Sequence, residues 1–446
     1  MTYGNAVVAA STFDAADQMS STTDNGPTGA TLASLTYTRD PNGRLASATS
    51  TGLPQNNQTY GYNPRGQLSN VNTDTYAYDP AGNPTTLAGA TTQTFDTADQ
   101  LSAATTAGAT TSYTYDGVGN QATSTPATGD HTTYTYDQAR RLSATQTGVP
   151  RSTYTYNGDG LRATRTTPAG TQRFAWDITS TVPQLISDAT TSYLYDDNGN
   201  PIEQIDTNGT ALYYQHDQYG STRLLTNQAG AIAATYTYNP YGALTTHTGT
   251  ADTPLRWNGQ YQDSDTGLYY LRARYYNPVT TQFLTRDPLE ALTLAAYAYA
   301  AGDPLDLADP LGLWGWSETL GTIGAVAGIA AIVAAGPVAI AFGAVAIVAG
   351  AGATYLDIAN GAPAWQVALD AVGVLPGAGA LAFDVKAGAF AARSSFALRN
   401  IGEATWWDLV AADYGAKASI AVDASSLTQE LANESSGNSS GPACSP

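Results

Sequence analysis

Cysteine and histidine are nearly missing from this sequence. Its 446 residues include one cysteine, Cys444, and three histidines, which are His131, His216 and His247. A single cysteine excludes an intramolecular disulfide, and three scattered histidines argue against a histidine-rich metal site. Because the sequence also has no phosphate-binding glycine loop and no cluster of metal ligands, we expect neither a cofactor nor a bound metal.

Charge is scarce as well, and basic charge most of all. Only 12% of the residues are charged, and 18 Lys and Arg stand against 37 Asp and Glu, which gives a net charge of −19. The phosphate backbone repels an acidic surface, so nucleic acid is excluded as a partner. Residues 1–10 lack the basic region and the long apolar run of a secretory signal peptide. We therefore expect either the C-terminal part of a longer protein or a chain exported without a cleaved signal.

Tyrosine, threonine and glycine take the place of the missing charge. The 29 tyrosines and 44 glycines are typical of β-sheet with many turns. In residues 1–250 one unit recurs: an aromatic residue, any residue, a second aromatic residue, Asp or Asn, and a turn rich in Gly, Pro and Asn. The second aromatic position occurs in twelve copies, 16 to 25 residues apart, with one histidine among them: Phe13, Tyr37, Tyr62, Tyr78, Phe95, Tyr115, Tyr136, Tyr156, Trp176, Tyr195, His216 and Tyr238.

The spacing within the unit predicts a β-hairpin. In a copy such as Tyr113-Thr114-Tyr115, alternation places both rings on one face of a strand. The Asp or Asn that follows binds its own backbone, and glycine supplies the positive φ of a turn. One hairpin alone is marginally stable, so we expect stacked copies to bury their tyrosines against one another in a long antiparallel array. The tyrosines are therefore interpreted as packing residues.

The copies resemble the YD repeats of the Rhs (rearrangement hotspot) proteins, the wall-associated toxins related to them, and the teneurins. The segment 254–288 resembles the Rhs repeat-associated core domain almost position by position, and it departs from that domain at Asn277 and at Thr281 and Gln282. The clearest matches are Gly-Gln-Tyr at 259–261, Thr-Gly-Leu-Tyr-Tyr at 266–270, and Arg-x-Arg-Tyr-Tyr at 272–276.

This resemblance covers about residues 1–313 and implies the domain organisation. It implies a mainly β fold in which the hairpin array curls into a partial shell around a variable C-terminal effector. Twelve copies imply a segment of a shell and not a complete one. Four parts are expected: the YD-repeat array at 1–250, the repeat-associated core at 251–313, a hydrophobic helical segment similar to pre-toxin regions at 314–390, and a short variable tail, partly disordered, at 391–446.

A doubled Asp-Pro motif closes the core. Asp-Pro-Leu-Glu at 287–290 and Asp-Pro-Leu-Gly at 309–312 resemble the family's doubled DPxG motif, which supports aspartyl-protease-like self-cleavage just after the core. In that chemistry two carboxylates share a proton; one activates water and the other polarises the scissile carbonyl. The resemblance implies these site residues: the dyad Asp287 and Asp309, Arg286 as the cation that keeps one carboxylate ionised, and a scissile bond between Leu313 and Trp314.

Alternatives to this interpretation stay open. Asp-Pro is also a common pair in turns and at helix starts, which needs no catalysis. Asp303 and Asp306 lie between the two motifs, so either is a rival for the second carboxylate. Glu290 takes the place of the first motif's glycine, at a position that we expect to need an unusual backbone conformation.

The character of the sequence changes after Leu313. Residues 319–356 contain no charged side chain and exceed the length of one membrane-spanning helix, and Pro337 divides them into two arms of a predicted helical hairpin. Three interpretations are open: a membrane-inserting or translocating hairpin, a helical plug buried inside the shell, and an ordinary soluble core. No histidine follows His247, which excludes a histidine-based nuclease site in the tail.

Two function classes fit these observations. The first is the C-terminal part of an Rhs-type polymorphic toxin, secreted or at the cell surface, whose shell encloses a C-terminal segment and releases it by self-cleavage in competition between cells. Its expected partners are that segment, an immunity protein and, through 319–356, a membrane. The second is a non-enzymatic cell-surface or wall-associated YD-repeat protein that binds glycans through exposed tyrosine rows. An inert remnant is a third interpretation. Cleavage separates the first class from the second.

Overall fold

The computed structural model describes residues 1–313 except 55–56, 149–150, 181 and 294. The predicted segments 314–390 and 391–446, the uncharged run 319–356 and the residue Trp314 lie outside the described residues. Within the described ranges, no helix has both the length and the apolar character needed to cross a membrane.

Most of the described chain is antiparallel β-sheet in which strands pair with their neighbours in sequence. The first sheet has seven strands: β1 (Val8–Phe13), β2 (Met19–Asn25), β3 (Thr31–Arg39), β4 (Leu45–Thr51), β5 (Gln58–Tyr62), β6 (Leu68–Val71) and β7 (Asp74–Thr75). The second has eleven: β8 (Ala77–Tyr78), β9 (Pro84–Leu87), β10 (Thr91–Phe95), β11 (Leu101–Thr106), β12 (Ala109–Tyr115), β13 (Gln121–Thr125), β14 (Thr132–Tyr136), β15 (Leu142–Thr147), β16 (Arg151–Tyr156), β17 (Arg162–Thr167) and β18 (Gly170–Arg173). The third has eight: β19 (Ala175–Asp177), β20 (Gln184–Ser187), β21 (Thr191–Tyr195), β22 (Pro201–Asp206), β23 (Ala211–His216), β24 (Thr222–Asn227), β25 (Ile232–Tyr238) and β26 (Leu244–Gly249). We call these three sheets the wall.

Each of the twelve predicted copies ends one strand of a hairpin in the wall, as the repeat pattern predicts. In the copy at β12, the Asp116 N–H donates to the Asn120 carbonyl at 2.8 Å, and the Asp116 Oδ1 atom accepts from the Asn120 N–H at 2.9 Å. Gly119 in the same turn has a φ of +86°. The pairing register shifts at the end of each of these strands, which marks a β-bulge that bends and twists the sheet. The bulges thus give the array its curvature.

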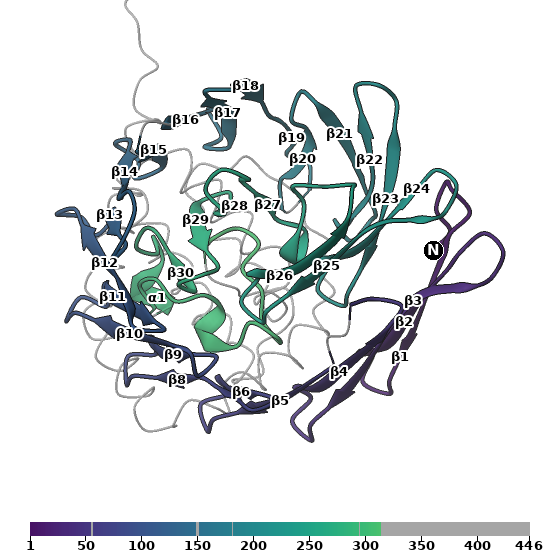
Figure 1. Ribbon diagram of the computed structural model, residues 1–446, viewed down its shortest axis with the longest axis horizontal. Helices are drawn as coiled ribbons and strands as arrows, with labels where there is room; N and C mark the ends of the chain where they lie inside the picture. The colour runs from purple at the N-terminus through teal and green to yellow at the C-terminus, as the bar shows by residue number, and fades with distance from the viewer. Residues whose placement is uncertain (55–56, 149–150, 181, 294, 314–446) are drawn as a thin grey trace, which may run out of the picture. The chain divides into compact units, whose positions relative to one another are not determined.

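Residues 251–313, the core segment, lie inside the curve of the wall (Figure 1). They form a fourth sheet, two short 3₁₀ turns and one short helix: β27 (Tyr261–Gln262), β28 (Tyr269–Leu271), β29 (Arg274–Asn277), β30 (Gln282–Phe283), η1 (Trp257–Gly259), η2 (Ala300–Gly302) and α1 (Glu290–Thr293). Direct hydrogen bonds join the wall to this segment. The Tyr297 hydroxyl of the core segment donates to the Gly119 carbonyl at 2.7 Å, and the Gln93 Nε2 atom of the wall donates to the Thr280 carbonyl at 3.1 Å.

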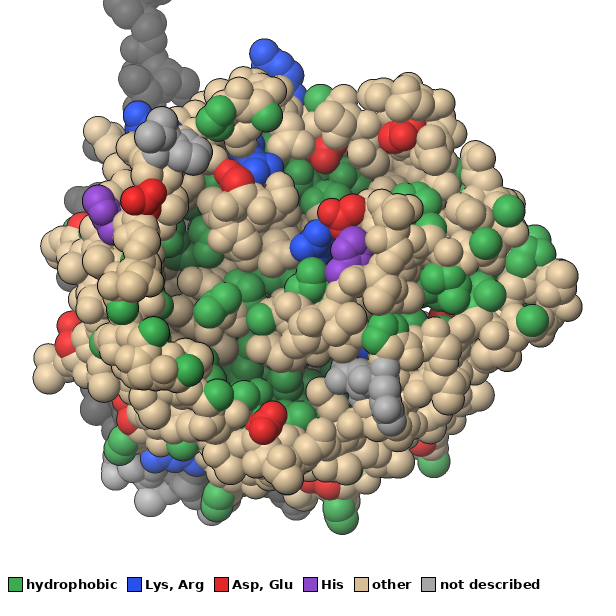
Figure 2. Space-filling model, in the orientation of Figure 1, with side chains coloured by type: hydrophobic (Ala, Val, Ile, Leu, Met, Phe, Trp, Pro, Cys, Tyr) green, Lys and Arg blue, Asp and Glu red, His purple; other side chains and the backbone are tan. Residues whose placement is uncertain are grey.

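Aromatic rings fill the space between wall and core segment. Five rings of the core segment pack together with centroids 4.8 to 6.5 Å apart for the pairs in contact: Trp257, Tyr269, Tyr276, Phe283 and Tyr299. The same buried cluster includes rings of the wall, those of Tyr193, Tyr214 and Tyr236. Figure 2 shows few charged side chains on the face in view and hydrophobic side chains in the hollows between wall and core segment. The tyrosines therefore act chiefly as packing residues.

Buried ion pairs to Asp263 also join the wall to the core segment, from Arg162 at close range and from Arg165 at 3.8 Å. Arg162 begins β17, and its Nη1 atom lies 2.9 and 2.8 Å from the two carboxylate oxygens of Asp263. Both side chains are fully buried. The guanidinium lies 4.2 to 5.9 Å from the centres of five aromatic rings, those of Tyr154, Phe174, Tyr261, Tyr270 and Tyr275. Cation–π attraction adds to the ion pair there.

The segment of shell curves far enough for its two ends to touch. The Asn5 Nδ2 atom, ahead of β1, donates to the Thr226 hydroxyl of β24 at 2.9 Å. The Arg39 Nη2 atom at the end of β3 donates to the Gln218 Oε1 atom, in the turn between β23 and β24, at 2.7 Å. The first hairpins therefore pack against the last sheet of the wall.

Asp24 makes the stability of the wall depend on pH. Its side chain, on β2, is 6% exposed, and burial raises its pKa to about 7. A carboxyl group whose folded-state pKa lies above its unfolded value destabilises the fold as pH rises between the two values. We expect Asp24→Asn to leave stability nearly unchanged near pH 4, where the carboxyl is protonated. At pH 8 the substitution should raise the free energy of unfolding by up to about 4 kcal/mol, because burial shifts the pKa from 3.8 to about 7 and each pKa unit corresponds to about 1.4 kcal/mol. Urea unfolding across this pH range is the measurement, and parallel curves for the two proteins would contradict the assignment.

Candidate active site

Asp287 and Asp309 meet at one guanidinium group. Asp287 follows β30 and precedes α1, whereas Asp309 follows η2. The Arg274 Nη2 atom, at the start of β29, lies 3.2 Å from the Oδ2 atom of Asp287 and 3.2 Å from the Oδ2 atom of Asp309. The two carboxylate oxygens are therefore within twice that distance of each other. The three side chains are almost wholly buried, with residue exposures of 2% for Arg274, 4% for Asp287 and 1% for Asp309.

Backbone N–H groups orient the other oxygen of each carboxylate. The Asp287 Oδ1 atom accepts from the Leu289 N–H at 2.7 Å. The Asp309 Oδ1 atom accepts from the Leu313 N–H at 2.9 Å. Both Asp-Pro motifs thus form turns capped by their own aspartate. The second turn places Leu313, the residue before the predicted scissile bond, in direct contact with Asp309 of the dyad.

Burial and charge perturb Asp287. Desolvation raises its pKa most strongly, Asp309 and Glu290 raise it further, and Arg274 and the Leu289 N–H lower it. A carboxyl group with a raised pKa retains its proton to higher pH, so Asp287 is suited to carry a proton beside an ionised partner.

Arg286 does not lie where the sequence resemblance placed it. Its Nε atom donates to the Glu290 Oε2 atom at 2.8 Å, one turn further along the chain, and the pair is partly exposed. Arg274, and not Arg286, bridges the two aspartates. The expected unusual backbone at Glu290 is also wrong: Glu290 begins α1 and does not have a positive φ. Gly312, at the matching place in the second motif, does have one, +68°.

The rival carboxylates Asp303 and Asp306 face another part of the wall. The Asp306 Oδ1 atom accepts from the Leu45 N–H at 3.1 Å, and its Oδ2 atom accepts from the Tyr62 hydroxyl at 3.0 Å. Desolvation and the neighbouring Asp306 raise the pKa of Asp303 to about 8. Asp306 thus fastens the segment between the two motifs to β4 and β5, and Arg274 bridges Asp309 and not Asp306.

The turn between β28 and β29 holds the chain ahead of the predicted scissile bond. The Ala273 N–H donates to the Leu311 carbonyl at 3.0 Å, and the Arg274 Nε atom donates to the Gly312 carbonyl. A Cβ atom at Gly312 would lie 2.7 Å from the Leu271 carbonyl oxygen and 2.9 Å from the Arg274 nitrogen. Leu313 is buried, and Trp314 lies outside the described residues.

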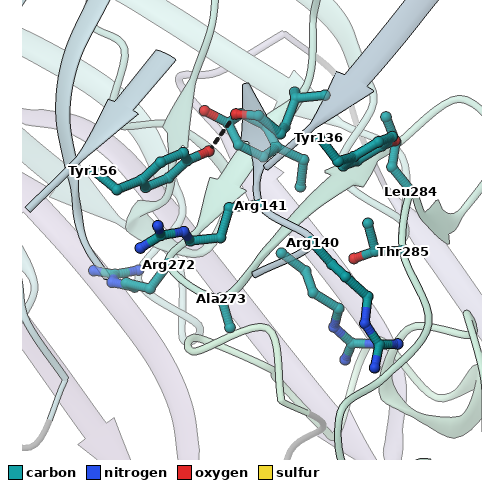
Figure 3. Close-up of a pocket in the computed structure, with 11 residues that line it drawn as sticks. Tyr136, Arg140, Arg141, Tyr156, Arg272, Ala273, Leu284 and Thr285 are labelled. Atoms are coloured by element: carbon teal, nitrogen blue, oxygen red, sulfur yellow. Dashed lines mark hydrogen bonds between the residues drawn. The ribbon is translucent and has the colours of Figure 1, made fainter. Parts of the chain in front are cut away.

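A small cavity of about 10 Å³, with room for about one water molecule, separates this turn from the wall. In Figure 3 Tyr136, Arg141 and Tyr156 line its wall side, and Arg272 and Ala273 line the side of the turn. Leu284 and Thr285 also line the cavity, next to β30. Among the residues that the structure describes, no group of three or more His, Cys, Asp and Glu side chains is placed to hold a metal ion.

Sequence reasoning missed Arg274. The signal was present in the Arg-x-Arg-Tyr-Tyr segment at 272–276, which the resemblance singled out without a role for either arginine. Proximity in sequence favoured Arg286, the residue next to Asp287, whereas Arg274 reaches Asp309 across 35 residues. The pairing of β29 with β30 brings Arg274 near Asp287, and the hydrogen bond from the Ala273 N–H to the Leu311 carbonyl holds the chain after Asp309 beside the same turn.

Curated relatives match limited parts of the chain. The tRNA3(Ser)-specific nuclease WapA of Bacillus spizizenii is 33% identical over 135 residues, which are 28% of this chain and 6% of the relative. The Double-stranded DNA deaminase toxin A of Burkholderia cenocepacia is 29% identical over 170 residues, 33% of this chain and 12% of the relative. Toxin protein Tse5 of Pseudomonas aeruginosa is 33% identical over 121 residues, 27% of this chain and 9% of the relative. The chain thus matches at most about an eighth of the length of these proteins.

Solved structures share the fold. The crystal structure of TcdB2-TccC3 superposes with a TM-score of 0.53 at 19% identity, over 70% of this chain and 19% of that one. The Tc holotoxin pore of Photorhabdus luminescens gives a TM-score of 0.55 at the same identity. These likenesses confirm the predicted fold class of a mainly β shell.

A family model also matches the chain, over more residues than the three curated relatives above. The Teneurin YD-shell model matches residues 8–134 and 179–301, which together exceed half of the 446 residues. The matched ranges include most of the wall and all of the core segment from Trp257 to Ala301. Together with the toxin relatives, this match confirms the resemblance to Rhs and YD-repeat proteins. The chain belongs to the teneurin YD-shell family.

Proposed function

We propose that this chain is the shell and release part of a polymorphic toxin, and that it cuts itself between Leu313 and Trp314. The observation that most directly supports this proposal is that the Arg274 guanidinium bridges Asp287 and Asp309. Asp309 also accepts a hydrogen bond from the Leu313 N–H, next to the proposed scissile bond. Toxin relatives and toxin-shell structures support the shell role. Intact-mass analysis of the purified chain, with the aspartate variants described in the Discussion, is the experiment that tests it.

The proposed reaction is the hydrolysis of one peptide bond. Ionised Asp309 takes a proton from a water molecule, whose oxygen attacks the Leu313 carbonyl carbon. Protonated Asp287 donates a hydrogen bond to the carbonyl oxygen as negative charge develops there. The tetrahedral intermediate then collapses, the C–N bond breaks, and the Trp314 nitrogen leaves as an amine with a proton from the dyad. The products are a carboxylate at Leu313 and a new N-terminus at Trp314.

Arg274 keeps the dyad in the state that this reaction needs. Two buried carboxylates at short range cannot both be ionised at low cost, and a bridging cation stabilises the form with one proton and one negative charge. The Arg274 guanidinium also lies 3.6 Å from the centre of the Phe283 ring, which holds the plane of the guanidinium in place. Little reorganisation then separates the folded chain from the reacting geometry.

The proposed partners follow from the shell. The first is the chain's own segment 314–446, enclosed and then released; the others are an immunity protein and, through 319–356, a membrane. We propose a secreted or cell-surface location, because Tse5 and the Tc holotoxin are toxins by name. Glycan binding without cleavage, the alternative function, is the outcome if the chain never cuts itself.

Gly312 tests the path of the chain through the site. We expect Gly312→Ala to slow cleavage at least about 100-fold, because its Cβ atom would push Leu313 away from Asp309 and a misplacement of about 1 Å costs that much. Time-resolved gel analysis of newly synthesised chain measures the rate. Gly267→Ala is the matched control: Gly267 also has a positive φ, +70°, but nothing lies near its Cβ position. Equal cleavage rates for the two variants would contradict the proposed path.

A further inference from the structure

Arg272 joins three parts of the molecule that are far apart in sequence. It lies in the turn between β28 and β29 with a φ of +60°. Its Nε and Nη2 atoms donate to the Pro183 carbonyl, just ahead of β20 in the wall, at 3.1 and 2.8 Å. Its Nη1 atom donates to the Pro310 carbonyl at 3.0 Å and also to the Gln260 Oε1 atom. One guanidinium therefore spans the wall, the core segment and the chain that leads to the scissile bond.

These acceptors are neutral. Within the described part of the chain, no carboxylate lies within ion-pair distance of Arg272, in contrast to Arg162 and Arg274. The side chain also lies against Trp176 of β19, 5.8 Å from the ring centre. A planar fork of donors suits this task, because it reaches two carbonyl oxygens at once in a fixed geometry. Arg272 is thus placed to fix the backbone at Pro183 and Pro310 by hydrogen bonds, and neither aspartate of the dyad is among its partners.

Its position along the chain gives those contacts a consequence for cleavage. Pro310 lies three residues before Leu313, and the Ala273 N–H and Arg274 hold the next two carbonyls. The segment 310–312 therefore runs along the turn, with Arg272 at its far end. Among these hydrogen bonds, those from Arg272 to the Pro183 carbonyl reach the wall.

We propose that Arg272 is a positioning residue that makes self-cleavage depend on the closure of the wall around the core segment. When the loop ahead of β20 is in place, the Pro183 carbonyl fixes the guanidinium, and the guanidinium aligns segment 310–313 with the dyad. When this loop is displaced, the segment loses one anchor and the scissile carbonyl leaves the reacting geometry. This inference rests on the proposed self-cleavage. It adds that the chain cuts itself efficiently only after the wall has packed around the core segment.

Glycine is the informative replacement at this position. Arg272→Gly keeps the turn, because glycine adopts a φ of +60° without strain, and it opens a space that free guanidinium can enter. Arg140→Gly is the matched control, since Arg140 has the same φ of +60° and lines the same cavity. Arg140 is exposed and makes none of the contacts with segment 310–313.

The experiment follows cleavage of the full chain after pulse-labelled synthesis. We expect Arg272→Gly to slow cleavage at least about 10-fold and Arg140→Gly to cut at the wild-type rate. Millimolar guanidinium should restore much of the rate in Arg272→Gly, and urea at the same concentration should not. Arg272→Lys should be intermediate, because one ammonium group cannot span both carbonyls. Guanidinium should have no effect on the Arg272→Gly, Asp287→Asn double variant.

Two kinds of failure are distinguishable. If wild type cuts and Asp287→Asn does not, yet Arg272→Gly cuts at the wild-type rate, the positioning role is overturned and self-cleavage stands. A slow Arg272→Gly variant that guanidinium does not rescue also overturns it, because Arg272 then acts only on stability. If wild type never cuts, or Asp287→Asn cuts as wild type does, the proposed function itself fails.

Discussion

Asp287→Asn and Asp309→Asn should each yield one uncut chain, whereas wild type yields a fragment that ends at Leu313 and a fragment that starts at Trp314. Asparagine keeps the size of the side chain and its capping oxygen but cannot exchange the shared proton. General acid and base catalysis contributes about 10²–10⁴-fold, so each variant should slow the cut at least about 100-fold. Intact-mass analysis after a fixed incubation measures the ratio of cut to uncut chain, including fragments that stay associated.

The controls for this prediction come from the same segment. Asp306→Asn removes a half-buried carboxylate of the neighbouring acidic pair without touching the Arg274 bridge, so that variant should still cut. Cleavage should also fall as pH rises through the raised pKa of Asp287, because the proton that Asp287 carries is lost there. A wild-type chain that stays whole at every pH, alone and when supplied with further N-terminal repeats, would leave both aspartates as turn formers.

Asp263→Asn should cause the largest loss of stability among the substitutions considered. It leaves the Arg162 guanidinium fully buried within five aromatic rings and without its carboxylate. Breaking a buried ion pair by removing one partner typically costs about 3–5 kcal/mol. Because Arg162 belongs to the wall and Asp263 to the core segment, the loss also weakens the docking of one against the other. Urea unfolding of uncut chains, on an Asp287→Asn background, gives the free energy of unfolding.

Asp137→Asn is the matched control for this variant. Asp137 pairs with Arg141 at 2.8 Å, but both side chains are more than a quarter exposed, so the loss should stay below about 1 kcal/mol. The double variant Arg162→Met, Asp263→Leu removes both charges and should recover much of the stability, since apolar side chains replace a buried ion pair at little cost. If Asp263→Asn costs no more than Asp137→Asn, the ion pair does not hold wall and core segment together.

The sequence by itself determined the repeating unit of this protein. A strand of alternating aromatic residues, an aspartate or asparagine that caps its own turn, and a glycine with positive φ act within about ten residues of one another. Local hydrogen bonds and steric limits decide their conformation wherever the hairpin lies. The twelve copies and the mainly β class were therefore readable without any knowledge of distant contacts.

Only the tertiary structure decided which charges act together. Arg286 is next to Asp287 in sequence but pairs with Glu290, whereas Arg274 reaches both Asp287 and Asp309. The pairing of Arg162 with Asp263 crosses 101 residues, and the contact of Asn5 with Thr226 crosses 221. Hairpin patterns define which residues face inward, but the curvature of the whole wall decides which inward faces meet. Buried charged side chains pair across those faces, because an ion removed from water is stabilised only by a nearby opposite charge or by hydrogen bonds.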